Sequence, residues 1–302
     1  MTGPRDGVSY KLVDTKTGRA DTIDDAYAGI GPDDVLATTV VRYKAADGMD
    51  IMAYLTLPKG RAPKGLPLVV LPHDGPSDHD SPGFDWLAQA IASGGYAVLQ
   101  PQYRGSSGFG WALEQEGSGQ WGRKMQSDLS DGVRALAAQG LVDPRRVCIV
   151  GLGGYAGYAA VAGVTLESGV YRCAAAYGGL FDLRNTIPWR EGRLGWASED
   201  QSLRLWDRAL GITGPADPLL AQISPLKHVD GTSGPILLIH GLDDTEVDPE
   251  ESRTMAEALK RAGKPVDLVL ISNEDHWLSH SETRLQMLQA TIKFLETNNP
   301  PN

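Results

Sequence analysis

An acid and an imidazole in the last third of the chain could together move a proton. Asp244 lies in LLIHGLDDTEV, at the end of an apolar strand-like run, and His276 lies in SNEDHWL after the next such run. A carboxylate that orients an imidazole also stabilises its protonated form, so the imidazole can accept a proton from a nucleophile. Their separation of 32 residues leaves room for one helix and one strand, which brings both loops to the same sheet edge. We therefore expect Asp244 and His276 to form a catalytic pair.

The segment that should supply the nucleophile contains no serine. The residues GLGGYAGYAA (151–160) follow the apolar run VCIV (147–150) and lead into an apolar helix start. A hydrolase nucleophile stands on such a strand-to-helix turn, between small residues, because larger side chains would collide there. The turn, the acid and the histidine therefore follow the chain order of an α/β-hydrolase, while the hydroxyl group is missing.

Short apolar runs alternate with amphipathic segments along most of the chain. We expect strands at 39–45, 49–58, 67–72, 96–101, 146–151, 171–177, 235–240 and 266–271, and helices near 84–93, 125–139, 155–165, 250–262 and 281–297. The first two strands are joined through Asp47-Gly48, which predicts an antiparallel hairpin. The alternation predicts an α/β fold with an eight-stranded, mostly parallel sheet and helices on both faces.

Two segments depart from this alternation. Residues 1–35 are polar and are expected to form a separate N-terminal arm, so that the main domain spans 36–302. Residues 182–225 fit no strand-helix unit, and their tryptophans Trp189, Trp196 and Trp206 predict a small helical insertion that forms a lid or a pocket wall.

The motifs around these residues resemble the catalytic domain of the prolyl oligopeptidase family of serine peptidases, over roughly residues 38 to 300. The resemblance is carried by PHDGP (72–76), YRGSSGFG (103–110), QWGRKMQSDLSDGV (120–133), the Gly-rich turn, HGLDDTEV (240–247) and EDHWLSHSETRLQML (274–288). It implies an α/β-hydrolase fold and cleavage of peptide or ester bonds without a cofactor or metal.

The resemblance also implies roles for single residues. The acid of the family's G-x-x-D-x-x-V motif falls on Asp244, and the histidine falls on His276. Oxyanion-hole donors fall on His73 and on the backbone N–H of Tyr155. The substrate pocket is expected to include Asp74 and Trp189, and Tyr103 with Arg104 is expected to line either that pocket or the sheet edge.

The nucleophile of the family does not carry across. The family's turn resembles G-x-S-Y-[GA]-G-Y, whereas this chain is one residue longer and has no serine. Alignment from the helix side places Gly154 at the serine's position, and alignment from the strand side would choose Gly153. We prefer Gly154, because Tyr155 then follows the nucleophile position and its N–H becomes the expected donor.

Two further departures concern the pocket and the entry to it. Asp74 replaces a glycine of the family's H-G-G-P motif, and a carboxylate there would oppose developing negative charge unless its side chain turns away. Family members usually carry a β-propeller before this domain. Here the arm VSYKLVDTKTGRADTI (8–23) resembles the tail of a last propeller blade.

Composition limits the classes of partner. The formal charge of −10 and the pI near 5.1 disfavour nucleic acid and anionic membranes, so small molecules or peptides fit better. No signal peptide or membrane-spanning run precedes the domain, which predicts a cytoplasmic protein. The sequence does not predict an oligomeric state. Cys148 and Cys173 lie in apolar runs and are expected to pack as buried residues rather than to form a disulfide.

Several other readings compete with these. The Gly-rich turn could bind phosphate, but it lacks the G-x-G-x-x-G spacing. The acidic segment at 73–80, with His73, Asp74, Asp78, His79 and Asp80, matches no metal-ligand pattern and is expected to be a solvated loop.

Two functions remain in competition. The sequence predicts a serine hydrolase of prolyl oligopeptidase type that acts on short peptides or esters, with a glycine at the nucleophile position that is either natural, so that activity is lost, or engineered. The alternative is a non-catalytic binding or interaction protein on a hydrolase scaffold.

Overall fold

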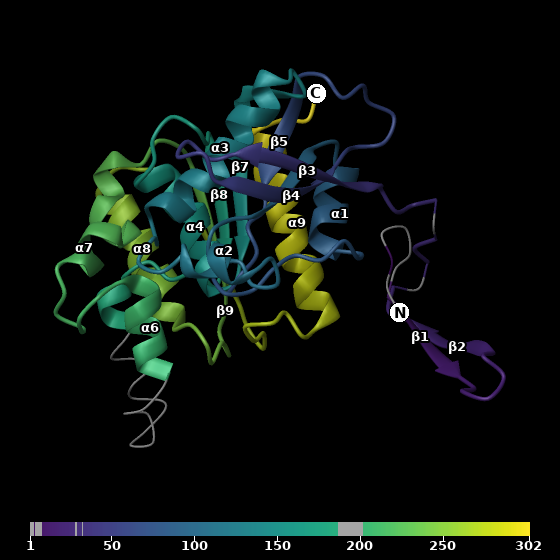
Figure 1. Cartoon of the computed structure of the whole chain (residues 1–302). Coiled ribbons are helices and arrows are strands. Elements are labelled where there is room, and N and C mark those ends of the chain that lie inside the picture. The colour runs from purple at the N-terminus through teal and green to yellow at the C-terminus, as the bar shows by residue number, and fades with distance from the viewer. Residues whose placement is uncertain (1–2, 4–7, 28, 32, 187–201) are drawn as a thin grey trace.

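The computed structural model describes residues 3, 8–27, 29–31, 33–186 and 202–302, and it describes side chains in the last range from 206 onward. An eight-stranded sheet forms the centre of the molecule, with strand order β10-β9-β8-β7-β5-β6-β4-β3 (Figure 1). The strands are β3 (Thr38–Lys44), β4 (Asp50–Thr56), β5 (Leu66–Val70), β6 (Ala97–Gln102), β7 (Val142–Leu152), β8 (Cys173–Tyr177), β9 (Ile236–Gly241) and β10 (Val266–Ile271). These are the eight predicted strands, and the α/β-hydrolase type of fold is confirmed.

Only β4 runs against the rest of the sheet. It pairs antiparallel with β3 through the predicted hairpin, in which Gly48 adopts a φ of 89°, and antiparallel with β6 on its other side. All other neighbouring strands are parallel. The carboxyl ends of the parallel strands therefore meet at one edge, where loops from β5, β7, β9 and β10 can meet.

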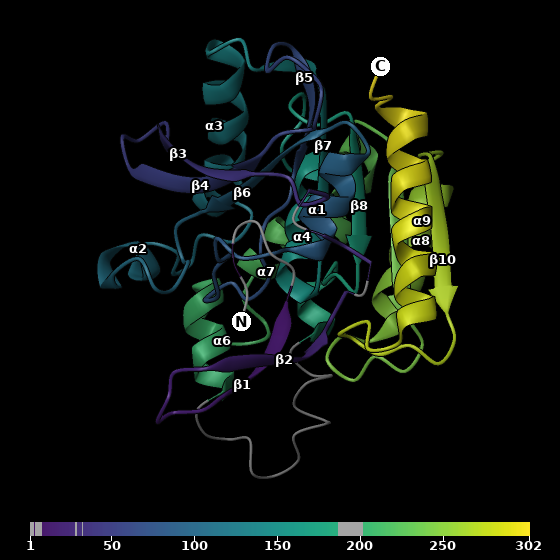
Figure 2. The same cartoon turned by 90° about the vertical axis from the view of Figure 1, so that its right-hand side faces the viewer.

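Helices cover both faces of the sheet (Figures 1 and 2). One face packs against α1 (Trp86–Ser93) and α9 (Ser281–Asn298), and the other against α3 (Lys124–Ala138), α4 (Gly154–Thr165) and α8 (Pro249–Arg261). The central strand β7 serves both layers, because Val147 and Ile149 face one core while Cys148 and Val150 face the other. The five predicted helices are confirmed within one or two residues at each end.

Shorter elements lie outside this framework. The N-terminal arm contains an antiparallel pair, β1 (Ser9–Val13) and β2 (Ala20–Asp25), which projects from the main body in Figure 1. The described part of the insertion contains α6 (Ser202–Leu210) and α7 (Leu219–Ile223), and it is followed by the 3₁₀ segment η2 (Pro225–Gly231). A further short helix, α2 (Trp111–Gln115), precedes α3.

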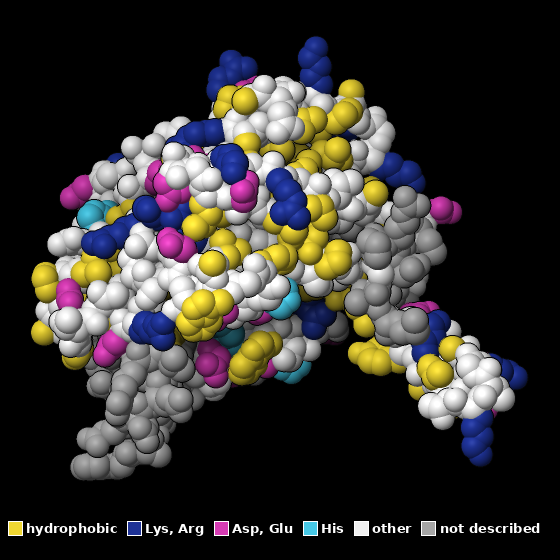
Figure 3. All heavy atoms as spheres, in the orientation of Figure 1, with side chains coloured by type: hydrophobic (Ala, Val, Ile, Leu, Met, Phe, Trp, Pro, Cys, Tyr) yellow, Lys and Arg dark blue, Asp and Glu magenta, His cyan; other side chains and the backbone are white. Residues whose placement is uncertain are grey.

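The surface carries charges of both signs. On the face shown in Figure 3, Lys and Arg side chains are interspersed with Asp and Glu side chains. Among the described residues, no helix combines the length and the apolar character that crossing a bilayer requires.

The expectation that the two cysteines do not form a disulfide is wrong. Cys148 on β7 and Cys173 on β8 are joined by a disulfide across the sheet. The parallel register places them directly opposite each other, with Cα atoms 4.8 Å apart, which lies within the range that a disulfide spans. Disulfides persist mainly in oxidising compartments, so this bond does not favour the expected cytoplasmic location, which stays a prediction.

The disulfide predicts a thiol count and a stability change. Protein denatured without reductant should show no reactive thiol, and reduction should release two, because the chain contains two cysteines. The 25-residue separation predicts that the reduced form loses about 3 kcal/mol of unfolding free energy. Thiol titration and urea denaturation measure both quantities. Two reactive thiols in protein purified without reductant would contradict the bond.

A buried carboxyl on α8 holds the start of the insertion. Glu251 Oε2 accepts the backbone N–H groups of Phe181 and Asp182, each at 2.8 Å. Burial raises the pKa of Glu251 from 4.5 to about 7. A carboxyl whose pKa is raised by folding stabilises the fold while it is protonated, and it loses that contribution as the pH rises from 4.5 through 7.

We therefore expect the unfolding free energy of the parent protein to fall as the pH rises from 4.5 to 7.5. The fall should exceed that of the Glu251→Gln variant over the same range by about 3 kcal/mol. The glutamine keeps an oxygen for the two backbone N–H groups but does not titrate. Urea denaturation at several pH values measures the difference. Parallel pH profiles for the two proteins would show that Glu251 is not the titrating group.

Candidate active site

The loops after β9 and β10 bring Asp244 and His276 into hydrogen-bond contact. His276 Nδ1 lies 2.8 Å from Asp244 Oδ2, and the Asp244 side chain is fully buried. The other carboxylate oxygen, Oδ1, accepts the backbone N–H groups of Glu246 and Val247, each at 2.8 Å. The structure thus brings the predicted pair together at the carboxyl edge of the sheet, with the carboxylate held from both sides.

A second imidazole, His240, also contacts this carboxylate. His240 Nε2 lies 3.3 Å from Asp244 Oδ2, and its Nδ1 lies 2.7 Å from Ser252 Oγ. His240 was not predicted as a site residue, although it stands four residues before Asp244 at the end of an apolar run. The His240 side chain is fully buried, whereas the His276 side chain is 10% exposed.

Opposing effects set the charge of the pair. Burial alone would raise the pKa of Asp244, but hydrogen bonds with His240 and His276 lower it well below the ordinary value. Burial likewise works to lower the pKa of His276, and the hydrogen bond and charge of Asp244, followed by the charge of Asp74, outweigh it and raise that pKa. The arrangement therefore favours an aspartate anion beside a readily protonated imidazole.

The Gly-rich turn between β7 and α4 is as tight as a strand-to-helix elbow requires. A Cβ on Gly151 would lie 1.8 Å from the carbonyl oxygen of Ala156, so a side chain at 151 has no room. Gly153 precedes the first helical residue and has a φ of 105°, which is a left-handed conformation that favours glycine. Its N–H donates to Tyr177 O at 2.9 Å, which anchors the turn to β8.

The two candidate nucleophile positions differ in space and backbone. Gly153 has the strained conformation of an elbow residue, but a Cβ there would lie 2.2 Å from Asp74 Oδ2. Gly154 is the first residue of α4, and the atoms nearest to a Cβ there would be those of Val247 and Leu180, at 3.5 Å or more. The conformation favours Gly153 and the open space favours Gly154, so the preference for Gly154 stays a prediction.

The Asp74 carboxylate lies on the amino end of α4. Its Oδ1 accepts the backbone N–H of Tyr155 at 2.7 Å and that of Ala156 at 3.1 Å. The N–H predicted to stabilise an oxyanion is therefore already bonded to an anion of the chain itself. Burial raises the pKa of Asp74, and the N–H of Ala156 and the charge of His276 partly offset that rise.

His73 lies behind this carboxylate in a buried group. Its Nε2 lies 2.7 Å from Ser106 Oγ and its Nδ1 lies 2.7 Å from the carbonyl oxygen of Asp74. The Tyr103 ring stacks on His73 at 4.3 Å between centroids, and its hydroxyl donates to His73 O at 2.9 Å. Tyr103 is therefore fully buried support for the Asp74 loop rather than a pocket wall. The oxyanion role of His73 stays a prediction.

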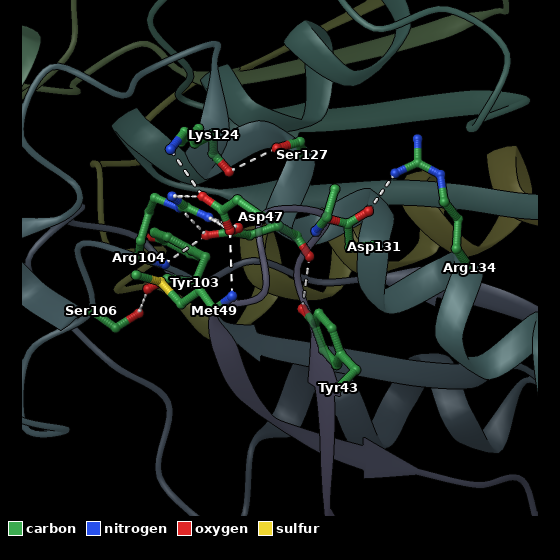
Figure 4. Close-up of polar contacts among 12 residues, drawn as sticks. Tyr43, Asp47, Met49, Tyr103, Arg104, Ser106, Lys124, Ser127, Asp131 and Arg134 are labelled. Atoms are coloured by element: carbon green, nitrogen blue, oxygen red, sulfur yellow. Dashed lines mark hydrogen bonds and ion pairs between the residues drawn. The ribbon is translucent and has the colours of Figure 1, made fainter.

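Of the two positions expected for Arg104, the pocket and the sheet edge, the structure contradicts the pocket. Its guanidinium is buried and donates to Asp128 through Nη2 at 2.7 Å and through Nε at 2.8 Å. A further bond from Nη1 reaches Asp47 at 2.9 Å, and Lys124 contacts the same aspartate (Figure 4). Arg104 thus ties the β3–β4 turn to α3. Its guanidinium bonds to Asp47 and Asp128 and does not face the cleft.

The Gly-rich turn, Asp74 and His276 line a cleft of about 480 Å³ at the carboxyl edge of the sheet. Its walls are Asp74, Gly75, Asp78, Leu152, Gly153, Gly154, Tyr155, Leu180, Trp206, Glu246, Val247, His276 and Trp277. Trp206 comes from the insertion, which therefore forms part of the wall. Trp189, also predicted in the pocket, lies outside the described residues. Within the described ranges, no three His, Cys, Asp or Glu side chains are grouped so that they could hold a metal ion.

Comparison with known proteins adds a family and a set of relatives. The model of the prolyl oligopeptidase family matches residues 82–299. Dipeptidyl aminopeptidase BIII of Pseudoxanthomonas mexicana is 33% identical over 267 residues, which cover 84% of this chain and 37% of the relative. Dipeptidyl peptidase family member 6 of Caenorhabditis elegans is 29% identical over 280 residues, with the same coverage.

Solved structures give a similar result. A puromycin-hydrolysing peptidase of Mycobacterium tuberculosis superposes on the whole chain with a TM-score of 0.88 and 28% identity, and the match covers 45% of that protein. A puromycin hydrolase superposes with a TM-score of 0.82 and 27% identity. The chain thus spans less than half the length of the relatives and structures that it matches.

Proposed function

This chain belongs to the prolyl oligopeptidase family, and we propose that its domain at 36–302 binds short peptides or esters in the cleft beside His276 without serine-dependent turnover. One observation carries the proposal: Asp74 occupies the Tyr155 and Ala156 N–H groups at a turn that holds no serine. The histidine–aspartate pair has no hydroxyl to activate there, and the N–H groups are not free for a substrate oxyanion.

The cleft still fits a peptide-sized ligand. Its volume of about 480 Å³ lies within the usual range for small-molecule sites, and Leu180, Val247, Trp206 and Trp277 supply apolar wall. Figure 3 shows charges of both signs on one face of the domain, which agrees with the proposed small ligand in place of a nucleic acid.

Calorimetry with short peptides tests the proposal. The protein should bind them without releasing product and should not react with a fluorophosphonate. Gly154→Leu should weaken binding about tenfold or more, or about 1.4 kcal/mol, because the new side chain extends toward Leu180 and Val247. Asp243→Asn, at an exposed neighbour of the site, is the matched control and should bind normally. Cleavage that a fluorophosphonate blocks would overturn the proposal.

The alternative is a binding or interaction protein whose partner does not enter this cleft. Loss of the serine and the carboxylate in its pocket both agree with that function. Folded protein that binds no short peptide, with or without Gly154→Leu, would favour it.

A further inference from the structure

The cleft contains a carboxylate that the serine mechanism does not use. We propose that Asp74 is a nucleophile that attacks the carbon of an epoxide, with His276 and Asp244 as its acid–base pair. The ligand class differs from the peptides and esters of the proposed function, and the two proposals are tested by separate readouts.

The two oxygens of Asp74 are in different environments. Oδ1 is fixed by the N–H groups of Tyr155 and Ala156, which orient the carboxylate on the twelve-residue helix α4. The backbone N–H of Gly75 also donates to this carboxylate. Oδ2 lies 2.2 Å from the place where a Cβ of Gly153 would stand. An oxygen of Asp74 thus stands at the elbow itself, where a hydrolase nucleophile belongs.

His276 lies across the same cleft. Both side chains line its wall, and the charge of each favours the charged form of the other. His276 is held by Asp244 through Nδ1 at 2.8 Å, so its Nε2 is the nitrogen left to exchange protons with a ligand. Two further acids, Asp78 and Glu246, line the same cleft as His276.

The hydrogen bonds of the Tyr155 and Ala156 N–H groups to Asp74 determine which kind of electrophile the site can accept. Attack on a carbonyl carbon would create a substrate oxyanion, and the Tyr155 and Ala156 N–H groups are already bonded to Oδ1. Attack on a saturated carbon creates no such oxyanion. An epoxide needs only a proton for its leaving oxygen, which the protonated His276 can donate.

The first step forms an ester. Asp74 Oδ2 bonds to an epoxide carbon, the carbon–oxygen bond of the ring breaks, and its electron pair stays on the ring oxygen. That oxygen takes the proton from His276 Nε2 and becomes a hydroxyl group. Neutral His276 and a hydroxyalkyl ester of Asp74 result.

The second step returns the enzyme with one water consumed. Neutral His276 takes a proton from water, and the hydroxide adds to the Asp74 carboxyl carbon. The electron pair of the carbonyl moves onto Oδ1, where the Tyr155 and Ala156 N–H groups stabilise it. Collapse breaks the bond between the carboxyl carbon and the ester oxygen, the alkoxide takes the proton of the new carboxyl group, and a diol leaves.

A purely structural role for Asp74 is the competing explanation. Gly153, at the N-cap of α4, makes no side-chain cap bond, and Asp74 supplies that cap from another loop. A cap alone would not exchange oxygen with solvent through an ester. The test therefore follows the atoms of Asp74 rather than stability.

Styrene oxide and propylene oxide are the probes, with enzyme in excess in water enriched in heavy oxygen. We expect diol, with heavy oxygen in the peptide that contains Asp74. His276→Gln should form neither ester nor diol, because it lacks the proton donor of the first step. Asp74→Asn keeps an oxygen for the helix and should lower diol formation about 10²-fold or more. Asp50→Asn, which removes an exposed carboxylate on β4, is the control and should not change diol formation.

Diol formed without label on Asp74, or no diol and no adduct from folded protein with either epoxide, would overturn the proposal. Neither result bears on peptide binding in the calorimetric experiment, so failure of one proposal is distinguishable from failure of the other.

Discussion

Replacing Asp74 by glycine and Gly153 by serine in the same chain is expected to turn on labelling by a fluorophosphonate. The glycine frees the N–H groups of Tyr155 and Ala156 and clears the space 2.2 Å from the new Cβ. The serine then stands at the residue with elbow geometry, near the Asp244–His276 pair. Hydrolysis of a p-nitrophenyl ester should rise about 10³-fold over the parent protein.

The single changes separate the two requirements. Gly153→Ser alone places its Cβ against the Asp74 carboxylate, and Asp74→Gly alone supplies no nucleophile, so neither should be labelled. A second double variant, Asp74→Gly with Gly154→Ser, tests the alignment from the helix side, where a side chain has room. Intact mass measures the label. If both double variants fold and neither is labelled, the site is not a hydrolase site that lost its serine.

Replacing Arg104 by methionine is expected to lower the unfolding free energy by about 3–5 kcal/mol. The methionine fills most of the volume but leaves the Asp128 carboxylate buried without its cation, and Asp47 loses its buried partner (Figure 4). An unpaired buried charge costs more than the ion pair itself contributes. Urea denaturation at neutral pH measures the loss.

Arg145→Met is the matched control, because Arg145 pairs with Asp143 while 87% of its side chain is exposed. Its unfolding free energy should be unchanged within error. Equal stability of Arg104→Met and the parent would show that the Arg104 ion pairs do not hold the β3–β4 turn on α3.

The framework could be predicted because its signals are local. The central parallel strands contain short apolar runs, because β-strands covered on both faces bury their side chains, and β5 and β8 are examples. The hairpin turn at Asp47-Gly48 has its own sequence signal. The positions of Asp244 and His276 followed from chain order and from the rule that parallel strands end at one edge.

The contacts that could not be predicted depend on register and on distant partners. The disulfide requires Cys148 opposite Cys173, and an apolar run does not fix its register with its neighbour. Arg104 stands in a loop beside motifs of the pocket, and only the folded chain shows that Asp47 and Asp128 enclose it.

The role of Asp74 could be predicted only in part. Its sequence position predicted a conflict with negative charge at the oxyanion site. The structure shows that the carboxylate resolves the conflict by bonding to the amino end of α4, 81 residues away in sequence from Tyr155. That contact could not be read from either segment alone.

The most direct test of the central claim is a pH titration of the Tyr155 and Ala156 amide resonances by NMR. With Asp74 bonded to them, both amides should shift together at a midpoint above 3.8, because burial raises the pKa of that carboxyl. In Asp74→Asn the shift should vanish. Amides that do not respond in the parent protein, or that respond equally in Asp74→Asn, would contradict the claim that this carboxylate occupies the site.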